Sequence, residues 1–353
     1  MQVLQNNENT GKITQIQYWS ASHHLVAVQF WADEAEVVFP VFVTVTANPS
    51  VDRTVEVAEL VRGGLHRAAA VHIHPGGKGI NVARALVRNG LKARAIVPAG
   101  GVEGEQLITL LGDYSIDVVR VPATGPVRSN ISVIEPDATV TKLNEAGAEL
   151  SEEETKAFSE AVLGNVADAS WVVAAGSLPP GMSDEFYADL IRRLGPGGAK
   201  IVVDTSGPAL LAAVKARPTL IKPNLEELEE AVKRPLWTLR DVVEAARELR
   251  ALGAGSVLAS LGSKGAVLVE ADGVWHAEAP VTARSTVGAG DAMLAGFIAA
   301  GGRGVTALSA GVAWGAAAVS LPGSTMPGPE DVRSHPVHVH AEPEWDRKLR
   351  DEP

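Results

Sequence analysis

The chain has 353 residues, of which 46% are hydrophobic and 21% are charged, so we expect a folded chain with a large core and neither a disordered nor a fibrous protein. The 42 acidic residues outnumber the 31 basic ones and give a formal net charge of -11, which argues against a nucleic-acid-binding surface and against an anionic membrane as partner. The sequence contains no cysteine, which excludes disulfides, thiol catalysis and iron–sulfur clusters.

The first 40 residues show no clear hydrophobic periodicity, and we interpret residues 1–40 as an N-terminal extension. They lack the basic start and apolar run of a secretory signal. No segment reaches the roughly 18 apolar residues that a membrane helix requires. We therefore expect a cytoplasmic location.

From residue 41 to residue 332, apolar β-branched runs alternate with helical stretches. Strands are predicted at residues 41–46, 93–97, 116–121, 171–174, 200–203, 219–221, 256–260 and 266–269. Capping patterns at Ser151 and Thr238 mark two helix starts. The alternation predicts an α/β fold whose mostly parallel central sheet is flanked by helices on both faces. Ligands are then expected at the carboxyl ends of the strands.

Three segments depart from this alternation. Residues 51–74 and 127–142 read as short strands with no helix between them, which predicts a small β-sheet that serves as a lid; irregular surface loops are the alternative. Residues 333–353 follow the last predicted helix. Their histidines, His335, His338 and His340, have a spacing typical of metal ligands, but a solvated tail or an appended remnant is the favoured interpretation.

The strongest local signal is Ser285-Thr-Val-Gly-Ala-Gly-Asp291, which precedes an apolar helical run. Small residues allow a sharp turn into a helix, whose first N–H groups and positive dipole end then form an anion site suited to phosphate. Asp291 has two possible roles there. It is either a general base that takes a proton from an attacking hydroxyl, or a carboxylate that complements the helix dipole at about 0.3 to 1 kcal/mol.

A second glycine-rich segment runs from Pro75 through Gly76, Gly77 and Lys78 to Asn81. It has neither the spacing of a Walker A loop nor the Gly-x-Gly-x-x-Gly of a dinucleotide-dependent oxidoreductase. Glycine permits close backbone approach, while a lysine and an asparagine at a helix start supply a cation and an amide. The segment suits a phosphorylated, hydroxylated ligand, and a glycine-rich turn with an exposed lysine is the alternative.

Two further segments carry weaker signals. Asn224 and Glu227 follow a predicted strand and have the spacing of a helix cap; alternatively, their oxygens lie near a hydrated Mg²⁺. Residues 260–266 contain Gly262 and Gly265 and predict a tight strand-to-strand connection. Its position suits a nucleotide, although an ordinary turn has the same pattern.

Together with Asn48-Pro-Ser-Val-Asp52 and Gly176-Ser-Leu-Pro-Pro-Gly181, these segments follow the motif order of the ribokinase-like (PfkB) carbohydrate kinases. The resemblance covers most of the chain and is greatest to the phosphosugar branch. It implies transfer of the γ-phosphoryl group of ATP to the 6-hydroxyl of D-fructose 1-phosphate. Kinases of tagatose 6-phosphate or fructose 6-phosphate are the alternatives, and Lys78 disfavours the latter, whose kinases tend to have glycine there. A sugar-phosphate-binding regulator is the non-enzymatic alternative.

The resemblance also implies residue roles. Asp291 is implied as the base, and the N–H groups of Gly288, Ala289 and Gly290 as the donors to the transferred phosphoryl group. The implied sugar-binding residues are Asp52, Gly76, Gly77, Lys78 and Asn81, with Arg128 and Asn130 from the lid. The implied nucleotide-binding residues are Lys222, Asn224, Ser260, Gly262, Ser263, Lys264 and Gly265, and Glu227 with Asn224 is implied to organise Mg²⁺ through water. A homodimer formed through the lid is also implied.

Overall fold

The computed structural model describes residues 2–7, 12–21, 24–29, 40–137, 139–195, 198–340 and 342–350. The chain divides into two units, residues 1–40 and 41–353. In the first unit, β1 (Gln2–Asn7), β2 (Lys12–Ala21) and β3 (His24–Gln29) form an antiparallel sheet in the order β1-β2-β3. These strands were not predicted, because residues 1–40 show no clear hydrophobic periodicity.

The second unit is built on a ten-stranded sheet with the order β17-β16-β15-β14-β13-β12-β11-β4-β7-β8. Its strands are β4 (Val41–Val45), β7 (Lys92–Ala99), β8 (Asp117–Pro122), β11 (Ala169–Ala175), β12 (Lys200–Asp204), β13 (Leu220–Ile221), β14 (Ser256–Ser260), β15 (Ala266–Val269), β16 (Val274–Glu278) and β17 (His338–His340). Neighbours from β14 to β8 are parallel, whereas β15, β16 and β17 are antiparallel additions. The predicted mostly parallel sheet is confirmed.

Helices cover both faces of this sheet. One face carries α1 (Lys78–Arg88), α2 (Gly101–Gly112), α8 (Ala289–Ala299) and α9 (Gly304–Val319), and the other carries α3 (Glu152–Gly164), α4 (Phe186–Leu194), α5 (Gly207–Lys215), α6 (Leu225–Val232) and α7 (Leu239–Leu252). Successive side chains of a strand point to opposite faces, so Phe42 packs in the first layer and Val43 in the second. Among the described residues, no helix has the length and apolarity to cross a bilayer.

The predicted helix starts depend on local hydrogen bonds. Ser151, Asn224 and Thr238 each accept a hydrogen bond from the backbone N–H three residues later, and the acidic side chain at that position accepts one in return. Such reciprocal capping satisfies N–H groups that have no partner within the helix. The capping interpretation of Asn224 is therefore confirmed.

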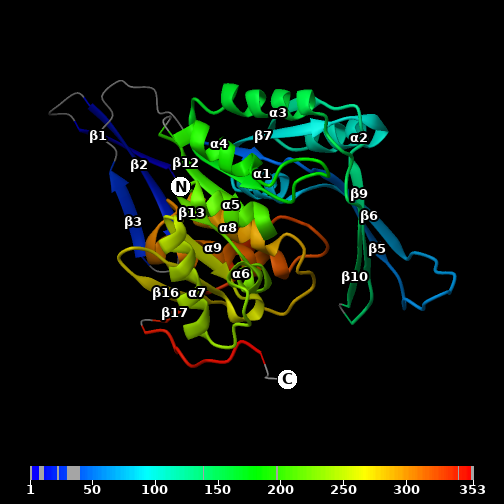
Figure 1. Cartoon of the computed structure of the whole chain (residues 1–353). Coiled ribbons are helices and arrows are strands. Elements are labelled where there is room, and N and C mark those ends of the chain that lie inside the picture. The colour runs from blue at the N-terminus through cyan, green and yellow to red at the C-terminus, as the bar shows by residue number, and fades with distance from the viewer. Residues whose placement is uncertain are drawn as a thin grey trace. The chain divides into compact units, whose positions relative to one another are not determined.

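The smaller sheet of this unit, which we call the lid, has four strands in the order β10-β9-β5-β6. It contains β5 (Ser50–Glu56), β6 (Ala70–Gly76), β9 (Arg128–Ile134) and β10 (Val140–Asn144). β5 pairs in parallel with β9, and the other neighbours are antiparallel. These strands extend away from the α/β body (Figure 1). The small sheet predicted for the two helix-poor stretches is confirmed over irregular loops.

The expectation of a solvated tail is wrong for the described residues beyond α10 (Pro329–Arg333). β17 pairs with β16 and extends the main sheet, and Trp345 and Leu349 pack against the second core layer. The backbone N–H of Leu349 also donates to the carbonyl of Trp237. The physical reason is that β16 would otherwise leave a row of backbone groups unpaired at the sheet edge.

Candidate active site

Two helix N-termini converge at the centre of the candidate site. Helix α1 begins at Lys78 and α8 begins at Ala289. The side-chain amide of Asn81 in α1 donates a hydrogen bond of 2.9 Å to Oδ2 of Asp291 in α8, and both residues are buried. The positive ends of two helix dipoles therefore face one region, as an anion site requires.

Glycines make the start of α8 possible. Gly288 is the N-cap with φ 77°, a left-handed conformation that favours glycine, and a Cβ atom there would lie 2.7 Å from Cε of Met326. A Cβ atom on Gly290 would lie 3.4 Å from Nζ of Lys222, so an ammonium group flanks the first turn. Of the three predicted donors, the N–H of Ala289 makes a long bond of 3.4 Å to the carbonyl of Thr286.

Asp291 is only 7% exposed, and its environment favours a poised base. Burial and the nearby charge of Asp204 raise its pKa from 3.8 to about 6, against the opposing effects of Lys222, Lys78 and the hydrogen bond from Asn81. Desolvation disfavours the charged form of a carboxyl group. A carboxylate with a pKa near 6 is deprotonated at neutral pH and still able to accept a proton.

A chain of charged side chains, centred on the buried Asp204, lies beside Asp291. Nζ of Lys78 lies 2.8 Å from Oδ1 of Asp204 and 2.9 Å from Oε1 of Glu227, while Nζ of Lys222 lies 2.9 Å from Oδ2 of Asp204. Burial opposes the ammonium form of Lys78, but the two carboxylates outweigh it and raise its pKa. Lys78 thus remains cationic next to the anion site. Burial opposes the carboxylate form of Asp204, but Lys222 and Lys78 lower its pKa.

Asp204 is the central residue that the sequence analysis missed. It is the last residue of β12 and is fully buried. The available signal was its place immediately after the predicted strand 200–203, at the carboxyl end where ligands bind in parallel sheets. Nothing in the local sequence indicated that Lys78 and Lys222, which are distant in the chain, would both reach it.

The predicted sugar-binding residues of the lid come together. The parallel pairing of β5 with β9 aligns Asp52 with Asn130, and the Asn130 amide donates to Oδ1 of Asp52 at 3.0 Å. The Ser50 hydroxyl donates to the same oxygen at 2.6 Å. A Cβ atom on Gly76 would lie 2.3 Å from the Asp52 carboxylate. Gly76 therefore allows Asp52 to lie against the chain that leads into α1.

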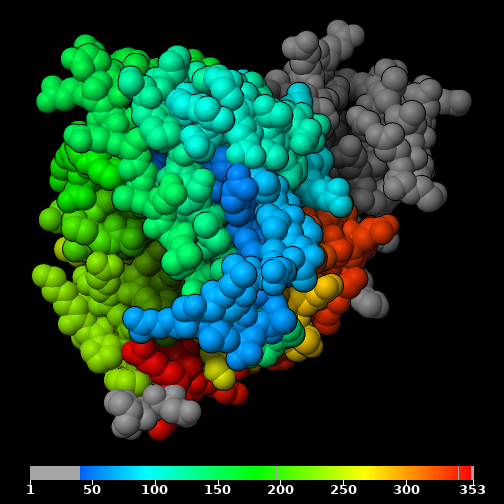
Figure 2. Space-filling view, turned by 90° about the vertical axis from the view of Figure 1, so that its right-hand side faces the viewer, coloured from blue at the N-terminus to red at the C-terminus, as the bar shows by residue number. Residues whose placement is uncertain are grey.

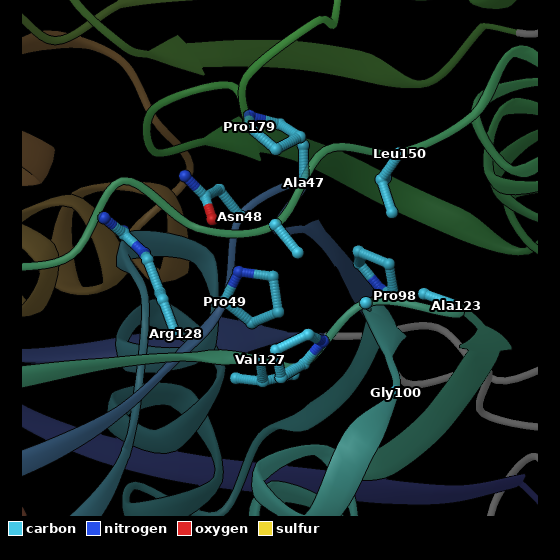
Figure 3. Close-up of a pocket in the computed structure, with 13 residues that line it drawn as sticks. Ala47, Asn48, Pro49, Pro98, Gly100, Ala123, Val127, Arg128, Leu150 and Pro179 are labelled. Atoms are coloured by element: carbon cyan, nitrogen blue, oxygen red, sulfur yellow. The ribbon is translucent and has the colours of Figure 1, made fainter.

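Arg128 and the loops behind the lid line a pocket. The Arg128 guanidinium donates to the carbonyl of Glu145 at 3.0 Å, and burial lowers its pKa against the effect of Asp52. Its side chain borders a pocket beside Asn48 and Pro49 (Figure 3). Of the predicted site residues, only Arg128 lines this pocket, which lies among the loops that follow β4, β7 and β8. In the space-filling view, a hollow lies next to the lid strands (Figure 2).

The predicted nucleotide-binding residues also lie on neighbouring segments. A parallel bridge links Asn224 to Ser260, and the N–H of Ser260 donates to the carbonyl of Pro223. The short 3₁₀ helix η2 (Gly262–Lys264) follows and leads to Gly265, which confirms the tight connection between β14 and β15. Both carboxylate oxygens of Glu227 already have partners, Lys78 and the N–H of Asn224.

Arg84 is a second residue that the sequence analysis missed. It is 2% exposed, and its Nη1 donates to Oδ1 of Asn81 at 3.0 Å. Because this oxygen is occupied, the amide NH₂ of Asn81 is left to face Asp291. Arg84 also donates to the carbonyl of Ser324 and the hydroxyl of Tyr114. An arginine three residues after Asn81 on a helix was the only local signal.

The α/β body, the sheet lid and a buried carboxylate between two helix N-termini define a kinase of the phosphoryl-transfer class. Residues 45–331 match the model of the pfkB family carbohydrate kinases. The chain belongs to this family, and it is a sugar-phosphate kinase with phosphotransferase activity.

The similar proteins include kinases of two phosphosugars. The chain is 40% identical over 261 residues to 1-phosphofructokinase from Rhodobacter capsulatus, which covers 72% of this chain and 82% of that protein. It is 39% identical over 255 residues to ATP-dependent 6-phosphofructokinase isozyme 2 from Escherichia coli K12, which covers 71% and 82%. The solved structure of Escherichia coli phosphofructokinase-2 in complex with substrates and products has a TM-score of 0.78 at 36% identity and covers 83% of this chain and 97% of that one.

Proposed function

We propose that this kinase transfers the γ-phosphoryl group of ATP to the 6-hydroxyl of D-fructose 1-phosphate and releases fructose 1,6-bisphosphate and ADP. The observation that carries the proposal is the buried carboxylate of Asp291, held by Asn81 between two helix N-termini. The similarity to 1-phosphofructokinase supports the choice of acceptor. Because the donor is ATP, we assign the reaction to the cytoplasm.

The chemistry follows from the position of Asp291. Its carboxylate removes the proton of the 6-hydroxyl while the hydroxyl oxygen attacks the γ-phosphorus, and the bond from that phosphorus to the β,γ-bridging oxygen breaks. The N–H groups of Gly288, Ala289 and Gly290 donate to the transferred group as its charge redistributes. Lys222, which flanks this turn, adds positive charge. ADP leaves with the electron pair of the broken bond.

The sugar phosphate is assigned to the lid side of the site. Asp52 and Asn130 bind hydroxyl groups, with Gly76 and Gly77 allowing close approach, while Lys78 and Arg128 bind the phosphate already present. Lys78 pairs with Asp204 and Glu227. An incoming phosphate therefore competes with two carboxylates for this ammonium group.

The nucleotide is assigned to the opposite side. Lys222, Asn224 and the segment Ser260, Gly262, Ser263, Lys264 and Gly265 line it. Glu227 and Asn224 fit a hydrated Mg²⁺, because carboxylate and amide oxygens retain lone pairs that accept hydrogen bonds from metal-bound water. When bound, Mg²⁺ supplies positive charge that shields the ATP phosphates. Glu227 also holds Lys78 in place through its Oε1.

The lid is proposed as the contact surface of a homodimer. Its strands and their connection expose apolar side chains: Val71 is 50% exposed and Leu143 is 59% exposed. Leu65, in the connection between β5 and β6, is 83% exposed. A second copy that covers these side chains would remove apolar surface from water. Sedimentation velocity tests this assignment, because Leu143→Lys should shift the chain from dimer to monomer.

A panel of phosphorylated ketoses tests the function. ADP release is measured with fructose 1-phosphate, tagatose 6-phosphate and fructose 6-phosphate, and kcat/KM ranks them. We expect fructose 1-phosphate to rank first. A higher kcat/KM for either of the others would reassign the acceptor. Binding without turnover on every sugar would favour the sugar-phosphate-binding regulator instead, which the buried carboxylate at an anion site argues against.

A further inference from the structure

Four side chains capable of binding a metal share one face of the sheet edge formed by β16 and β17. His276 and Glu278 are two residues apart on β16, and His338 and His340 are two residues apart on β17. The register pairs His276 with His340 and Glu278 with His338. Alternate residues of a strand lie on the same face, so all four lie together, while Val339 packs against the core on the opposite face.

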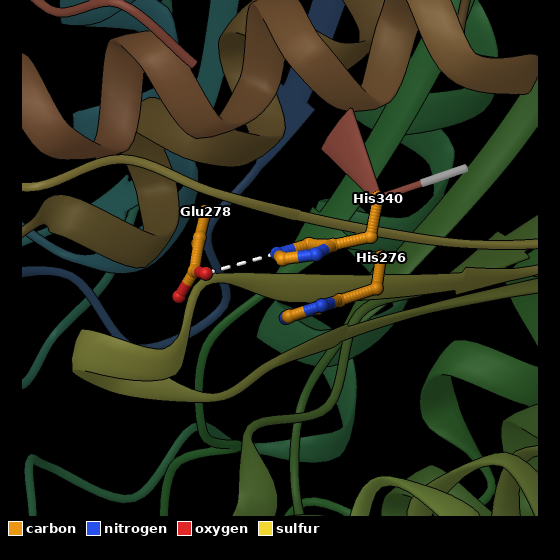
Figure 4. Close-up of side chains that lie close together, drawn as sticks. All are labelled: His276, Glu278 and His340. Atoms are coloured by element: carbon orange, nitrogen blue, oxygen red, sulfur yellow. Dashed lines mark hydrogen bonds and ion pairs between the residues drawn. The ribbon is translucent and has the colours of Figure 1, made fainter. Parts of the chain in front are cut away.

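Three of these residues lie close enough to bind one ion. One ring nitrogen of His276, one of His340 and a carboxylate oxygen of Glu278 lie within 4.8 Å of one another. Nε2 of His340 is 2.9 Å from Oε1 of Glu278, and the two imidazole rings stack with centroids 4.6 Å apart at 14° (Figure 4). The ring centroid of His338 is 4.5 Å from that of His340.

The hydrogen bonds of His276 leave it prepared as a ligand. Nε2 lies 2.8 Å from the carbonyl oxygen of Lys264. A carbonyl only accepts hydrogen bonds, so Nε2 carries the hydrogen atom, and in a neutral ring Nδ1 then has a free lone pair. His276 is fully buried, and its Nδ1 has no hydrogen-bond partner in the structure.

This arrangement is typical of a metal-binding histidine. Such a residue usually donates its other N–H to a backbone carbonyl or a carboxylate, which fixes the tautomer and the ring orientation. An unpartnered buried acceptor otherwise destabilises the fold. A cation at Nδ1 accounts for both features of His276.

Glu278 is held in place by an arginine. Arg347 donates to both of its oxygens at 2.8 and 2.7 Å. Each carboxylate oxygen has two lone pairs, so Arg347 leaves acceptor capacity for a cation. The positive charge of Arg347 weakens the attraction between this carboxylate and a cation, and the negative charge of the carboxylate offsets that effect.

We propose that His276, Glu278 and His340 bind a divalent transition-metal ion of the Zn²⁺ class, which fastens strand β17 to the kinase sheet. Two imidazoles and one carboxylate favour Zn²⁺, Ni²⁺ or Cu²⁺ over Mg²⁺, which prefers oxygen ligands. The site lies on residues other than those assigned to Mg²⁺ in the phosphoryl-transfer reaction. The proposed site brings together residues that are 62 to 64 positions apart in the chain, since β17 pairs with β16 and His340 lies opposite His276.

The test is to titrate the chelator-treated full chain with Zn²⁺ in saturating Mg²⁺ and to measure binding by isothermal titration calorimetry. We expect one Zn²⁺ per chain and a rise in the melting temperature on binding, because an ion that binds only the folded chain stabilises it. Co²⁺ in place of Zn²⁺ should give visible absorption bands. No Zn²⁺ binding, or binding with no change in melting temperature, would overturn the proposal.

Variants assign the ligands. His340→Gln and Glu278→Gln should each weaken Zn²⁺ binding by at least about tenfold, since loss even of an outer partner costs about 10- to 100-fold. His335→Gln is the matched control, because that ring contacts the carbonyl of Asp331 instead and should leave Zn²⁺ affinity unchanged. Circular dichroism shows whether each variant folds. Unchanged affinity in folded His340→Gln would place the ion elsewhere and contradict the assignment.

Discussion

The side-chain amide of Asn81 donates a 2.9 Å hydrogen bond to Oδ2 of Asp291, and this bond joins the first turns of α1 and α8. Asn81 is itself fixed by Arg84, whose guanidinium donates a hydrogen bond to Oδ1 of Asn81. The contact links the segment assigned to the sugar with the turn assigned to the transferred phosphoryl group. One hydrogen bond thus links the position of the sugar-binding segment to the position of the proposed catalytic base.

Asp291→Asn should reduce kcat by about 10² to 10⁴, the usual contribution of a general base, and should leave the affinity for the sugar phosphate almost unchanged. The amide keeps the size of the carboxylate and cannot take the proton. Steady-state kinetics with ADP release measures kcat, and calorimetry measures sugar affinity. Asp113→Asn, an exposed residue at the end of α2, is the control. An unchanged kcat would show that another group is the base.

The pKa of Asp291 also predicts a pH dependence of stability. Its folded pKa is raised from 3.8 to about 6, so the folded state holds this proton more tightly, and the corresponding stability is lost as pH rises through that window. At pH 8 Asp291→Asn should therefore increase the free energy of unfolding by about 1 to 3 kcal/mol. Urea unfolding at pH 8 and pH 3.5 tests this, because no gain is expected at the lower pH. A destabilised variant at pH 8 would contradict the argument.

The same pKa predicts that kcat of the unmodified chain rises with pH through about 6, as Asp291 loses its proton. The charge of Asp204 contributes to the raised value. Asp204→Asn should therefore shift the acidic limb of the kcat profile to lower pH. It should also destabilise the fold by about 3 to 5 kcal/mol, because Lys78 and Lys222 lose a buried partner. An acidic limb that stays at the same pH would show that Asp204 does not raise the pKa of the catalytic base.

Lys78→Ala should raise the KM for the sugar phosphate more than the KM for ATP, because Lys78 is the first residue of α1 and directly follows Gly76 and Gly77 of the segment assigned to the sugar. Lys264→Ala in η2 is the matched comparison and should mainly raise the KM for ATP. Initial rates over a grid of both substrates separate the two effects. A selective loss of ATP affinity in Lys78→Ala would move this lysine to the nucleotide side.

Gly76→Ala should displace the Asp52 carboxylate, because the new Cβ atom would lie 2.3 Å from it. We expect a loss of about 1 to 3 kcal/mol in stability, typical of overpacking, together with a higher KM for the sugar phosphate. Gly164→Ala at the end of α3 is the control, since its Cβ atom meets nothing within 4 Å. Equal effects of both substitutions would argue against the contact with Asp52.

Short-range patterns in the sequence were sufficient to predict much of the fold. Strand β14 (Ser256–Ser260) and the caps at Ser151, Asn224 and Thr238 were predicted because their signals lie within a few residues. The glycine-rich turns before Lys78 and Asp291 were found for the same reason. The roles of these residues came from resemblance to a family, since a local pattern alone left base and dipole partner equally open for Asp291.

Tertiary structure decided which distant residues meet. The local sequence marks Asp204 only by its place at the end of a predicted strand, and the residue is central because the folded chain brings Lys78 and Lys222 to its carboxylate. Likewise, the sequence placed His340 in a predicted solvated tail. In the structure, β17 pairs with β16, and the ring of His340 stacks on that of His276. Hydrophobic periodicity reports how a segment buries its own side chains, whereas the pairing of edges and buried charges depends on the whole folded chain.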